Sequence, residues 1–310
     1  MLAVICNDQN LENLDSGLFF NEMNDLAKNI SIDSDLTVKI VDGKPISTPL
    51  KDIPEWSDAD FCLRSVTINP LTLRFVREQT QDICLNAVKR DGYALLYVKE
   101  QTPEICLAAV SQHGYALQYV KEQTPELCLT AVRQNGKALM FVKCQTPEIC
   151  LAAVRRHGYA LRYVKYQTPE ICMEAVRYDG YALQYVEEQT PEICLTAVDT
   201  IGTALQYVQE QTEEICMEAV RRESIALQYV QEQTPEMCQI AVENDSLSLQ
   251  YVKDQTYELC FEAVSNDGMS LEFVKEQTLE LCLEALSNAD AMKYVDPKFL
   301  EECKSKFEYY

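Results

Sequence analysis

Cysteine is the residue of this chain whose spacing could support chemistry, because thiolates ligate metals, form disulfides and act as nucleophiles. Most of the cysteines are 22 residues apart, which supplies no CxxC pair, and His113 and His157 are the only histidines. No metal site is therefore expected. Packed helices lie roughly 8 to 10 Å apart and a disulfide needs Cα atoms within about 7 Å, so we expect reduced, buried thiols. Eleven of the 14 cysteines recur every 22 residues: Cys62, Cys84, Cys106, Cys128, Cys150, Cys172, Cys194, Cys216, Cys238, Cys260 and Cys282.

Carboxylates also recur, but each follows closely on a helix start, where the helix dipole accounts for it. The chain has no Gly-rich phosphate loop, HExxH motif or serine elbow. We therefore predict that the protein is not an enzyme and expect no cofactor, no metal and no small-molecule substrate. The repeated acids begin with Asp60, Asp82, Glu104, Glu126, Glu148 and Glu170.

These groups belong to a 22-residue unit that recurs from about residue 57 to residue 278 and once more, shortened, to residue 297. Self-similarity at a short fixed period is typical of a solenoid, in which each repeat buries its apolar face against its neighbours. The pattern predicts an all-α, right-handed αα solenoid of eleven two-helix repeats followed by a C-terminal capping helix.

One unit shows how a repeat is expected to fold. Thr102 before a proline and a glutamate predicts a capped helix start, and Gly114 predicts a left-handed helix end. Residues 115–122 are then expected to form a second helix of about two turns, with Tyr119 on its core face and Tyr115 facing outward. Gln101 and its equivalents are expected to form a hydrogen-bonded ladder across the loops.

The ends of the chain depart from the repeat. Residues 1–56 are expected to form a small α/β module or cap, with a strand at 2–6, a helix over 18–30 and a hairpin at 36–46 with an Asp-Gly turn. Residues 57–297 form the predicted solenoid, and residues 298–310 form the predicted capping helix.

The repeat resembles the family catalogued as domain of unknown function 4116, through the pattern TPEICLxAVxxxGxALxYVKEQT, clearest at 102–123 and 146–167. The resemblance covers roughly residues 57–295 and leaves residues 1–56 outside it. It implies the repeat fold, and because the family is associated with giant DNA viruses and some protists it also implies a viral origin. It carries over no functional residue.

The composition indicates where in the cell the protein is expected. No run approaches the roughly 18 to 20 apolar residues of a membrane helix, so no membrane partner is expected. The N-terminus lacks a basic region and a long apolar stretch, so we expect no secretory signal. We predict a cytoplasmic protein, in the host cytoplasm or the virion if the chain is viral.

Charge is uneven along the chain, whose net charge is −22. Residues 133–177 hold eight basic and three acidic side chains, whereas residues 178–310 hold eight basic and 27 acidic ones. Such asymmetry can steer a partner. The bland alternative is that the basic residues complement helix dipoles.

We predict a docking patch for an acidic partner at these basic repeats, formed by Arg155, Arg156, Tyr159, Arg162 and Lys165. Aromatic residues and arginine are common interface anchors, so the outward tyrosines are further candidates, although packing explains them equally well. These are Tyr93, Tyr115 and Tyr181, in the same slot as Tyr159.

The predicted function is a non-enzymatic scaffold that binds proteins, because exterior positions vary between repeats while interior positions stay fixed. The alternative is a structural component of a larger, viral particle. Nucleic-acid binding through the basic central repeats is a weaker hypothesis, because a net charge of −22 repels a polyanion.

Overall fold

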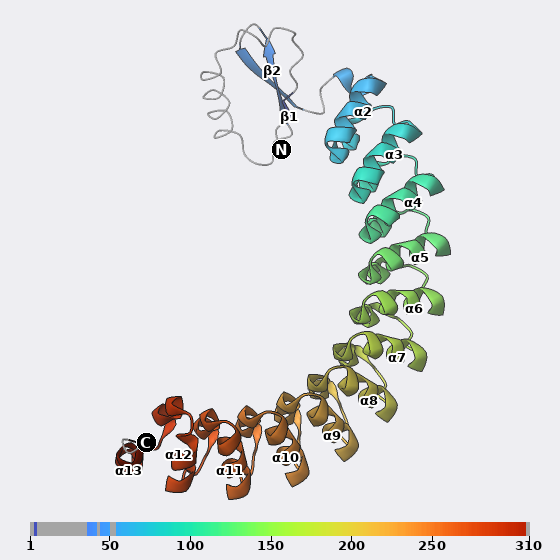
Figure 1. Cartoon of the computed structure of the whole chain (residues 1–310). Coiled ribbons are helices and arrows are strands. Elements are labelled where there is room, and N and C mark those ends of the chain that lie inside the picture. The colour runs from blue at the N-terminus through green and yellow to red at the C-terminus, as the bar shows by residue number, and fades with distance from the viewer. Residues whose placement is uncertain (1–2, 5–35, 42–43, 50–53, 308–310) are drawn as a thin grey trace. The chain divides into compact units, whose positions relative to one another are not determined.

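The computed structural model describes residues 3–4, 36–41, 44–49 and 54–307. Its repeat region alternates α-helices with short 3-10 helices (Figure 1). The α-helices are α2 (Ala59–Ile68), α3 (Gln81–Arg90), α4 (Pro103–Gln112), α5 (Pro125–Gln134), α6 (Pro147–Arg156), α7 (Pro169–Tyr178), α8 (Pro191–Thr200), α9 (Glu213–Arg222), α10 (Pro235–Asn244), α11 (Tyr257–Asn266) and α12 (Leu279–Ala285). The 3-10 helices that follow them are η4 (Pro70–Phe75), η5 (Gly92–Tyr97), η6 (Gly114–Tyr119), η7 (Gly136–Phe141), η8 (Gly158–Tyr163), η9 (Gly180–Tyr185), η10 (Gly202–Tyr207), η11 (Ser224–Tyr229), η12 (Ser246–Tyr251), η13 (Gly268–Phe273) and η14 (Ala289–Tyr294).

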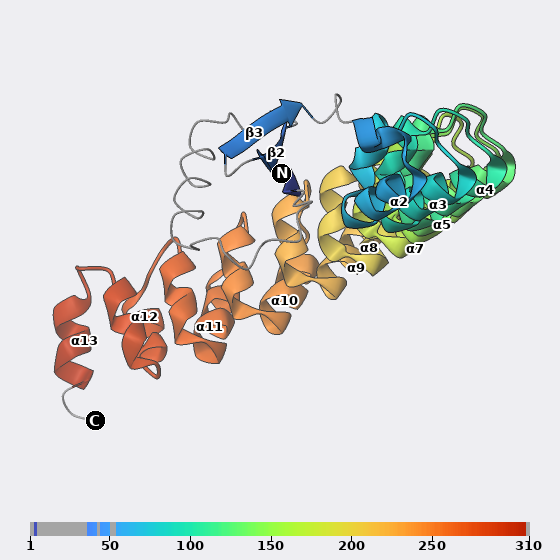
Figure 2. The same ribbon diagram turned by 90° about the horizontal axis from the view of Figure 1, so that it is seen from above.

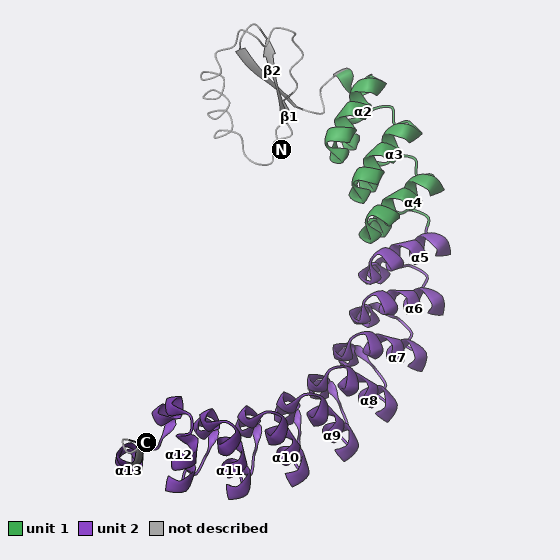
Figure 3. Ribbon diagram, in the orientation of Figure 1, with its two compact units in different colours: residues 1–122 green, residues 123–310 purple. Residues whose placement is uncertain are grey.

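The predicted α-solenoid of tandem repeats is confirmed. The chain forms two compact units, residues 1–122 and 123–310 (Figure 3). The first contains α2 to α4, and the second contains α5 to α12 and the final helix α13 (Leu300–Phe307). Within each unit, an α-helix packs against the α-helices and 3-10 helices of adjacent repeats, and Figure 2 shows α10, α11 and α12 following one another in this way.

The helices α3 to α12 each begin after a threonine cap, as the sequence predicts. The Thr146 side chain accepts a hydrogen bond from the backbone N–H of Ile149, and Pro147 and Glu148 occupy the first turn. Threonine satisfies a free amide, proline lacks the amide that would need a partner, and the acid complements the helix dipole. Short helices are marginal in water, so these caps and the packing between repeats must maintain them.

The second element of the repeat is a six-residue 3-10 helix, not the predicted α-helix of two turns. At three residues per turn, Gly158, Leu161 and Val164 share one row that faces the core, and Ala160 shares the next row with Tyr163. The small Ala160 is fully buried, whereas the ring of Tyr163 extends past the core edge and is half-buried. Tyr119 and its equivalents are therefore half-buried and not enclosed in the core as predicted, because the position that encloses the methyl group of an alanine leaves part of an aromatic ring exposed.

The recurring glycine serves a close approach between repeats and does not end the helix in a left-handed conformation. His157, which ends α6, is extended with φ −150° and ψ 110°, and Gly158 opens the 3-10 helix. A Cβ atom built on Gly158 would lie 2.7 Å from the carbonyl oxygen of Ala175 in the next repeat. Glycine is thus required because the next backbone occupies the space of a side chain.

Glutamine connects the loops, as predicted. The Gln145 amide nitrogen donates to the carbonyl of Tyr163 at 2.8 Å, and its oxygen accepts from the backbone N–H of Lys165 at 2.9 Å. The thiol of Cys150 donates to the same oxygen at 3.7 Å. We call such residues clamp glutamines, because each ties its loop to the next repeat: Gln79, Gln101, Gln123, Gln145, Gln167, Gln189, Gln211, Gln233, Gln255 and Gln277.

Outside the repeats, strands β1 (Ala3–Val4), β2 (Leu36–Val41) and β3 (Lys44–Pro49) form a sheet in the order β1-β2-β3. β2 and β3 pair antiparallel with Val41 opposite Lys44, which confirms the two strands of the predicted hairpin, and β1 pairs parallel to β2. The helix predicted over 18–30 lies outside the described residues. The domain boundaries at 56 and 297 stay predictions. No helix of the described part is long and apolar enough to cross a membrane.

Candidate protein interface

One aromatic side chain in every repeat lies at the end of the 3-10 helix and is half-buried. Its neighbours in the 3-10 helix, such as Ala182, Leu183 and Val186 around Tyr185, are at most 3% exposed. Each repeat therefore presents a ring edge beside its core. We call this set the aromatic row: Phe75, Tyr97, Tyr119, Phe141, Tyr163, Tyr185, Tyr207, Tyr229, Tyr251, Phe273 and Tyr294.

The predicted outward tyrosines flank the aromatic row. In the second unit, Tyr159 meets Tyr185 edge-on with ring centroids 5.8 Å apart, and Tyr181 meets Tyr207 at 6.0 Å. Burial raises the pKa of the Tyr159 hydroxyl, and nearby Asp179 adds to the effect. The Tyr181 hydroxyl lies 2.7 Å from the Thr203 hydroxyl, so this tyrosine also bonds to the next repeat.

Arg162 lies on the aromatic row. Its guanidinium carbon is 5.2 Å from the ring centroid of Tyr163 and 5.6 Å from that of Tyr185, within the range of cation–π attraction. The structure therefore brings Arg162 and Tyr159 together with two rings of the aromatic row. Aromatic side chains and arginine at one place are typical of interface hot spots.

Tyr93 and Tyr115 lie in the first unit, and both are half-buried. Tyr93 stacks on His113 at a centroid distance of 4.9 Å and meets Tyr119 edge-on at 6.4 Å. The backbone carbonyl of Tyr115 accepts from the Gln118 amide at 3.1 Å. The arrangement of the outer tyrosine beside the aromatic row of the next repeat thus also occurs in this unit.

Arg155 and Arg156 lie elsewhere, in the last turn of α6. Arg155 donates to Glu174 of the next repeat at 2.8 Å, and Arg177 lies 3.5 Å from the same carboxylate. The hydrogen bond from Arg155 holds the pKa of Glu174 below its ordinary value. Arg133, Glu148, Leu151, Ala152, Arg155 and Arg156 line an open hollow of about 550 Å³ on this α-helical layer.

Lys165 lies at the loop edge, where its ammonium group donates to the carbonyl of Lys143 in the preceding repeat at 3.3 Å. Lys121 donates to Lys99 in the same way at 2.9 Å. These lysines satisfy free carbonyls at the end of the preceding 3-10 helix, which agrees with the dipole interpretation of their charge. The predicted patch is therefore divided among three surfaces.

The recurring thiols are buried, and burial raises their pKa, to about 11 for Cys172 and Cys282. A thiol above its ordinary pKa is a poor nucleophile. Cys144 is an exposed thiol on a loop where other repeats carry an acid or Tyr166. Within the described part of the chain, no group of three or more His, Cys, Asp or Glu side chains could hold a metal ion.

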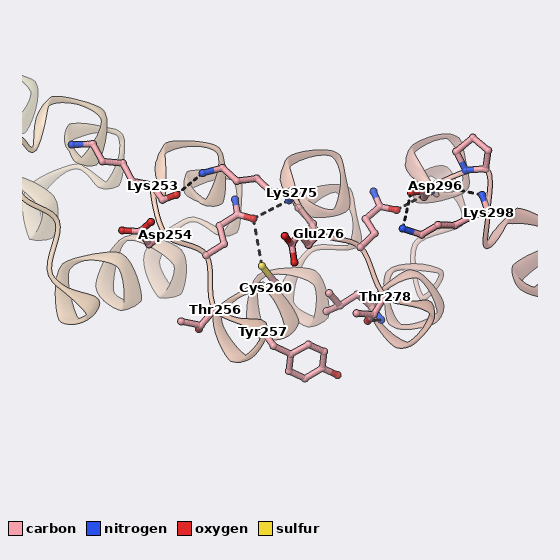
Figure 4. Close-up of a pocket in the computed structure, with 15 residues that line it drawn as sticks. Lys253, Asp254, Thr256, Tyr257, Cys260, Lys275, Glu276, Thr278, Asp296 and Lys298 are labelled. Carbon is pink, nitrogen blue, oxygen red and sulfur yellow. Dashed lines mark hydrogen bonds and ion pairs between the residues drawn. The ribbon is translucent and has the colours of Figure 1, made fainter.

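A second hollow, of about 880 Å³, lies on the loop edge beside the starts of α11 and α12 (Figure 4). Its cations already have partners, since Lys275 donates to the Lys253 carbonyl and Lys298 pairs with Asp296 at 3.1 Å. At its rim, a hydrogen bond to Glu280 raises the pKa of Tyr257 to about 12. This hollow thus offers an anion little uncompensated charge.

Sequence reasoning missed the aromatic row and the hollow at Ala152. Neither helical period identifies the row, because at three residues per turn Tyr163 still aligns with the fully buried Ala160. Comparing equivalent positions between repeats would have identified the hollow, because a neighbouring repeat has Glu174 where this repeat has Ala152.

Two consecutive stretches of the chain, residues 80–123 and 124–167, match the family model described as Domain of unknown function (DUF4116). Each stretch is two repeats long, so the resemblance noted from the repeat pattern is confirmed. No curated protein and no solved structure matches the chain.

Proposed function

We propose that the chain, in which residues 80–123 and 124–167 match the DUF4116 family model, is a non-enzymatic scaffold that binds proteins through its aromatic row. The observation that carries the proposal is the half-buried aromatic side chain of all eleven repeats. A residue needed only to fill the core could be smaller and fully buried, as Ala160 is on the same side of the 3-10 helix as Tyr163. An aromatic edge beside variable side chains supports recognition of a protein surface.

The positions around the aromatic row vary while the core does not. The slot of Arg162 holds Leu96, Met140, Gln184 or Glu272 in other repeats. In a solenoid such variation gives each repeat its own surface on a common frame. The best anchor is the cluster of Tyr159, Arg162, Tyr163 and Tyr185, which combines rings with a cation.

The test uses substitutions that the array already tolerates. Tyr159→Thr with Arg162→Gln installs the residues found at Thr203 and Gln184, so the variant is expected to fold. Tagged full-length chain and variant are expressed in the native host, and co-purifying proteins are quantified by mass spectrometry. Recovery of the partner should fall by about tenfold or more, since anchor residues each contribute on the order of 1–2 kcal/mol.

The control is Gln209→Lys with Gln231→Lys on the loop edge, where other repeats carry lysine at Lys165 and Lys253. This variant should recover the partner at the wild-type level. Equal recovery from all three proteins, or no protein bound at a defined stoichiometry, would contradict the proposal.

The second candidate is a structural component of a larger, viral particle, for which an extended repeat array is suitable. It differs in its readout, because a particle component sediments with the assembly at fixed stoichiometry and does not exchange. Binding of labelled RNA or DNA at low salt would instead support the nucleic-acid hypothesis, which the net charge of −22 opposes. The proposed location is the cytoplasm, or the virion if the chain is viral.

A further inference from the structure

A side-chain bridge recurs between neighbouring repeats on the α-helical layer. A residue in the last turn of one α-helix donates to a residue in the middle of the next α-helix. We call the first position the donor slot and the second the acceptor slot. The bridges are Thr67 to Asn86 at 3.1 Å, Arg155 to Glu174 at 2.8 Å and Ser265 to Glu284 at 3.0 Å.

The bridge is missing where its donor is Arg133, because Ala152 occupies the acceptor slot. The methyl group of Ala152 cannot accept a hydrogen bond, and the space of the missing carboxylate lies in the hollow of about 550 Å³. Within the described residues, neither Arg133 nor Arg156 has a hydrogen-bond or ion-pair partner. Arg155 uses Nε for Glu174, which leaves its terminal nitrogens available.

The next repeat shows what fills such a slot. There Glu174 lies between Arg155 of the preceding repeat and Arg177 of its own helix, at 2.8 and 3.5 Å. Arg133 and Arg155 have the same relation to Ala152, one repeat earlier. The hollow is therefore lined by the arginines Arg133 and Arg155 and lacks the carboxylate that Glu174 provides at the equivalent position of the next repeat.

We propose that this hollow binds an acidic segment of a partner protein, which inserts an Asp or Glu side chain at Ala152 between Arg133 and Arg155. The charge of the region matches such an occupant, since residues 133–177 carry a net charge of +5. Carboxylates and guanidinium groups form charge-assisted hydrogen bonds with matching geometry. The proposal stands whether or not the aromatic row binds a protein, because the two surfaces lie on different helices.

The remaining lining residues define the segment further. Leu151 offers a half-buried apolar side chain beside the arginines, which suits an apolar residue next to the acid. Glu148 at the start of α6 also lines the hollow and would repel a carboxylate near it, which favours entry of the acid between Arg133 and Arg155. The best ligand is an acidic peptide with a single apolar residue.

The test measures fluorescence anisotropy of a labelled peptide that alternates glutamate with glycine around one leucine, added to the full chain at low salt. A counterpart with glutamine in place of every glutamate reports binding that does not need charge. The key variant is Ala152→Glu, which supplies the missing carboxylate from within, as Glu174 does in the next repeat. Arg133→Ala removes the donor instead, so the result does not depend on one variant.

Both variants are expected to bind the acidic peptide at least about tenfold more weakly, the loss expected for one charge-assisted contact. Matched controls are Thr196→Glu, which adds the same charge at the acceptor slot two repeats later, and Arg221→Ala, which removes a donor-slot arginine three residues after Glu218. The controls should bind within about twofold of wild type.

No binding of the acidic peptide by the wild type, equal binding of the glutamine peptide, or equal loss in Ala152→Glu and Thr196→Glu would each overturn the proposal. Tighter binding of labelled RNA than of the peptide at the same salt would do so as well, because it would assign the arginines to phosphates. None of these results bears on partners lost in the Tyr159→Thr, Arg162→Gln variant.

Discussion

At the scale of single residues, two buried serines have hydroxyl groups whose hydrogen bonds are not satisfied in the part of the chain that the structure describes. Ser248 and Ser270 occupy a slot that holds alanine in most other repeats, and they are 1% and 0% exposed. Within the described residues, neither hydroxyl has a hydrogen-bond partner. A buried hydroxyl without a partner loses its hydration and gains no hydrogen bond in return.

We therefore expect Ser248→Ala and Ser270→Ala each to raise the free energy of unfolding by about 1 kcal/mol. Urea denaturation followed by circular dichroism measures the change. The reverse substitution, Ala204→Ser, should lower stability by a similar amount. A loss of stability in both serine variants would show that the hydroxyls are satisfied in solution.

His157 should make the stability of the array depend on pH. Its Nδ1 accepts from the backbone N–H of Gly136 at 3.1 Å, which requires the neutral ring. Burial lowers the pKa of His157, and Arg156 and Lys137 lower it further. The unfolded chain therefore takes up a proton first as pH falls, so the stabilising contribution is full above the ordinary histidine pKa and is lost down to the folded-state pKa.

The variant His157→Asn should lack this dependence, because asparagine is neutral and is already found in this slot at Asn135. Between about pH 8 and pH 5, the wild type should lose more unfolding free energy in urea than the variant does. Identical pH profiles for the two proteins would contradict the assignment.

The sequence shows which side chains recur at each position of the repeat, but it does not show which of them become buried when repeats stack. The threonine caps and clamp glutamines were predicted because their hydrogen bonds are local or repeat in register. The hollow at Ala152 was not predicted, because it depends on two residues 19 positions apart that meet only when repeats stack.

At the scale of elements, the glycine slot sets how closely neighbouring helices approach. Two repeats carry Ser224 and Ser246 in this slot, and there α9, α10 and α11 pack less closely than α5 to α8 do. Where glycine is present, the carbonyl of the next repeat takes the place of a side chain. From α5 to α11, closer packing thus goes with glycine in the slot.

Gly158→Ala should lower the free energy of unfolding by about 1 to 3 kcal/mol, because its methyl group would meet the Ala175 carbonyl and force the repeats apart. The control is Ser224→Ala, which should change stability by no more than about 0.5 kcal/mol because a Cβ is already accommodated there. Chemical denaturation of both variants measures the difference, and equal effects would contradict this account of the slot.

The period of the second helix explains why the sequence was misjudged at this scale. Six residues from a glycine to an aromatic are too few to distinguish three residues per turn from 3.6 by apolar pattern alone. The extended residues at both ends, His157 and Val164, limit the element to that length. The α-helix before it was predicted well, because its cap and its ten-residue apolar pattern agree.

At the scale of the whole molecule, the repeats within a unit contact their neighbours through equivalent residues, so one repeat of the second unit should be removable. Deleting residues 190–211 joins Gln189 to Thr212, and Gln189 then meets Tyr229 and Gln231 in place of Tyr207 and Gln209. The shortened chain should keep its helical circular dichroism per residue and unfold at a slightly lower temperature.

Deleting only residues 190–200 is the contrasting change, because it removes α8 and leaves η10 with only one of the two α-helices on which it packs, α9. This chain should lose cooperative unfolding. Equal behaviour of the two deletions would show that the 22-residue unit is not the unit of folding.

The architecture could be predicted from the sequence because a fixed period constrains every repeat at once. The binding face could not be predicted, because the core pattern is the same in every repeat and the surface depends on the exterior residues that differ between repeats. Those differences are small, such as one arginine at 162 or one alanine at 152, and their meaning depends on which neighbours they meet.

The clamp glutamines have a consequence for how the array opens. Each amide oxygen accepts from both the thiol of its own repeat and a backbone N–H of the next, so we expect a junction that opens to expose one sulfur. Alkylation under native conditions, read by peptide mass spectrometry, would therefore time the opening of each junction separately. Each recurring thiol would thus report the opening of its own junction, and the order in which the thiols react would show at which junction the array begins to unfold.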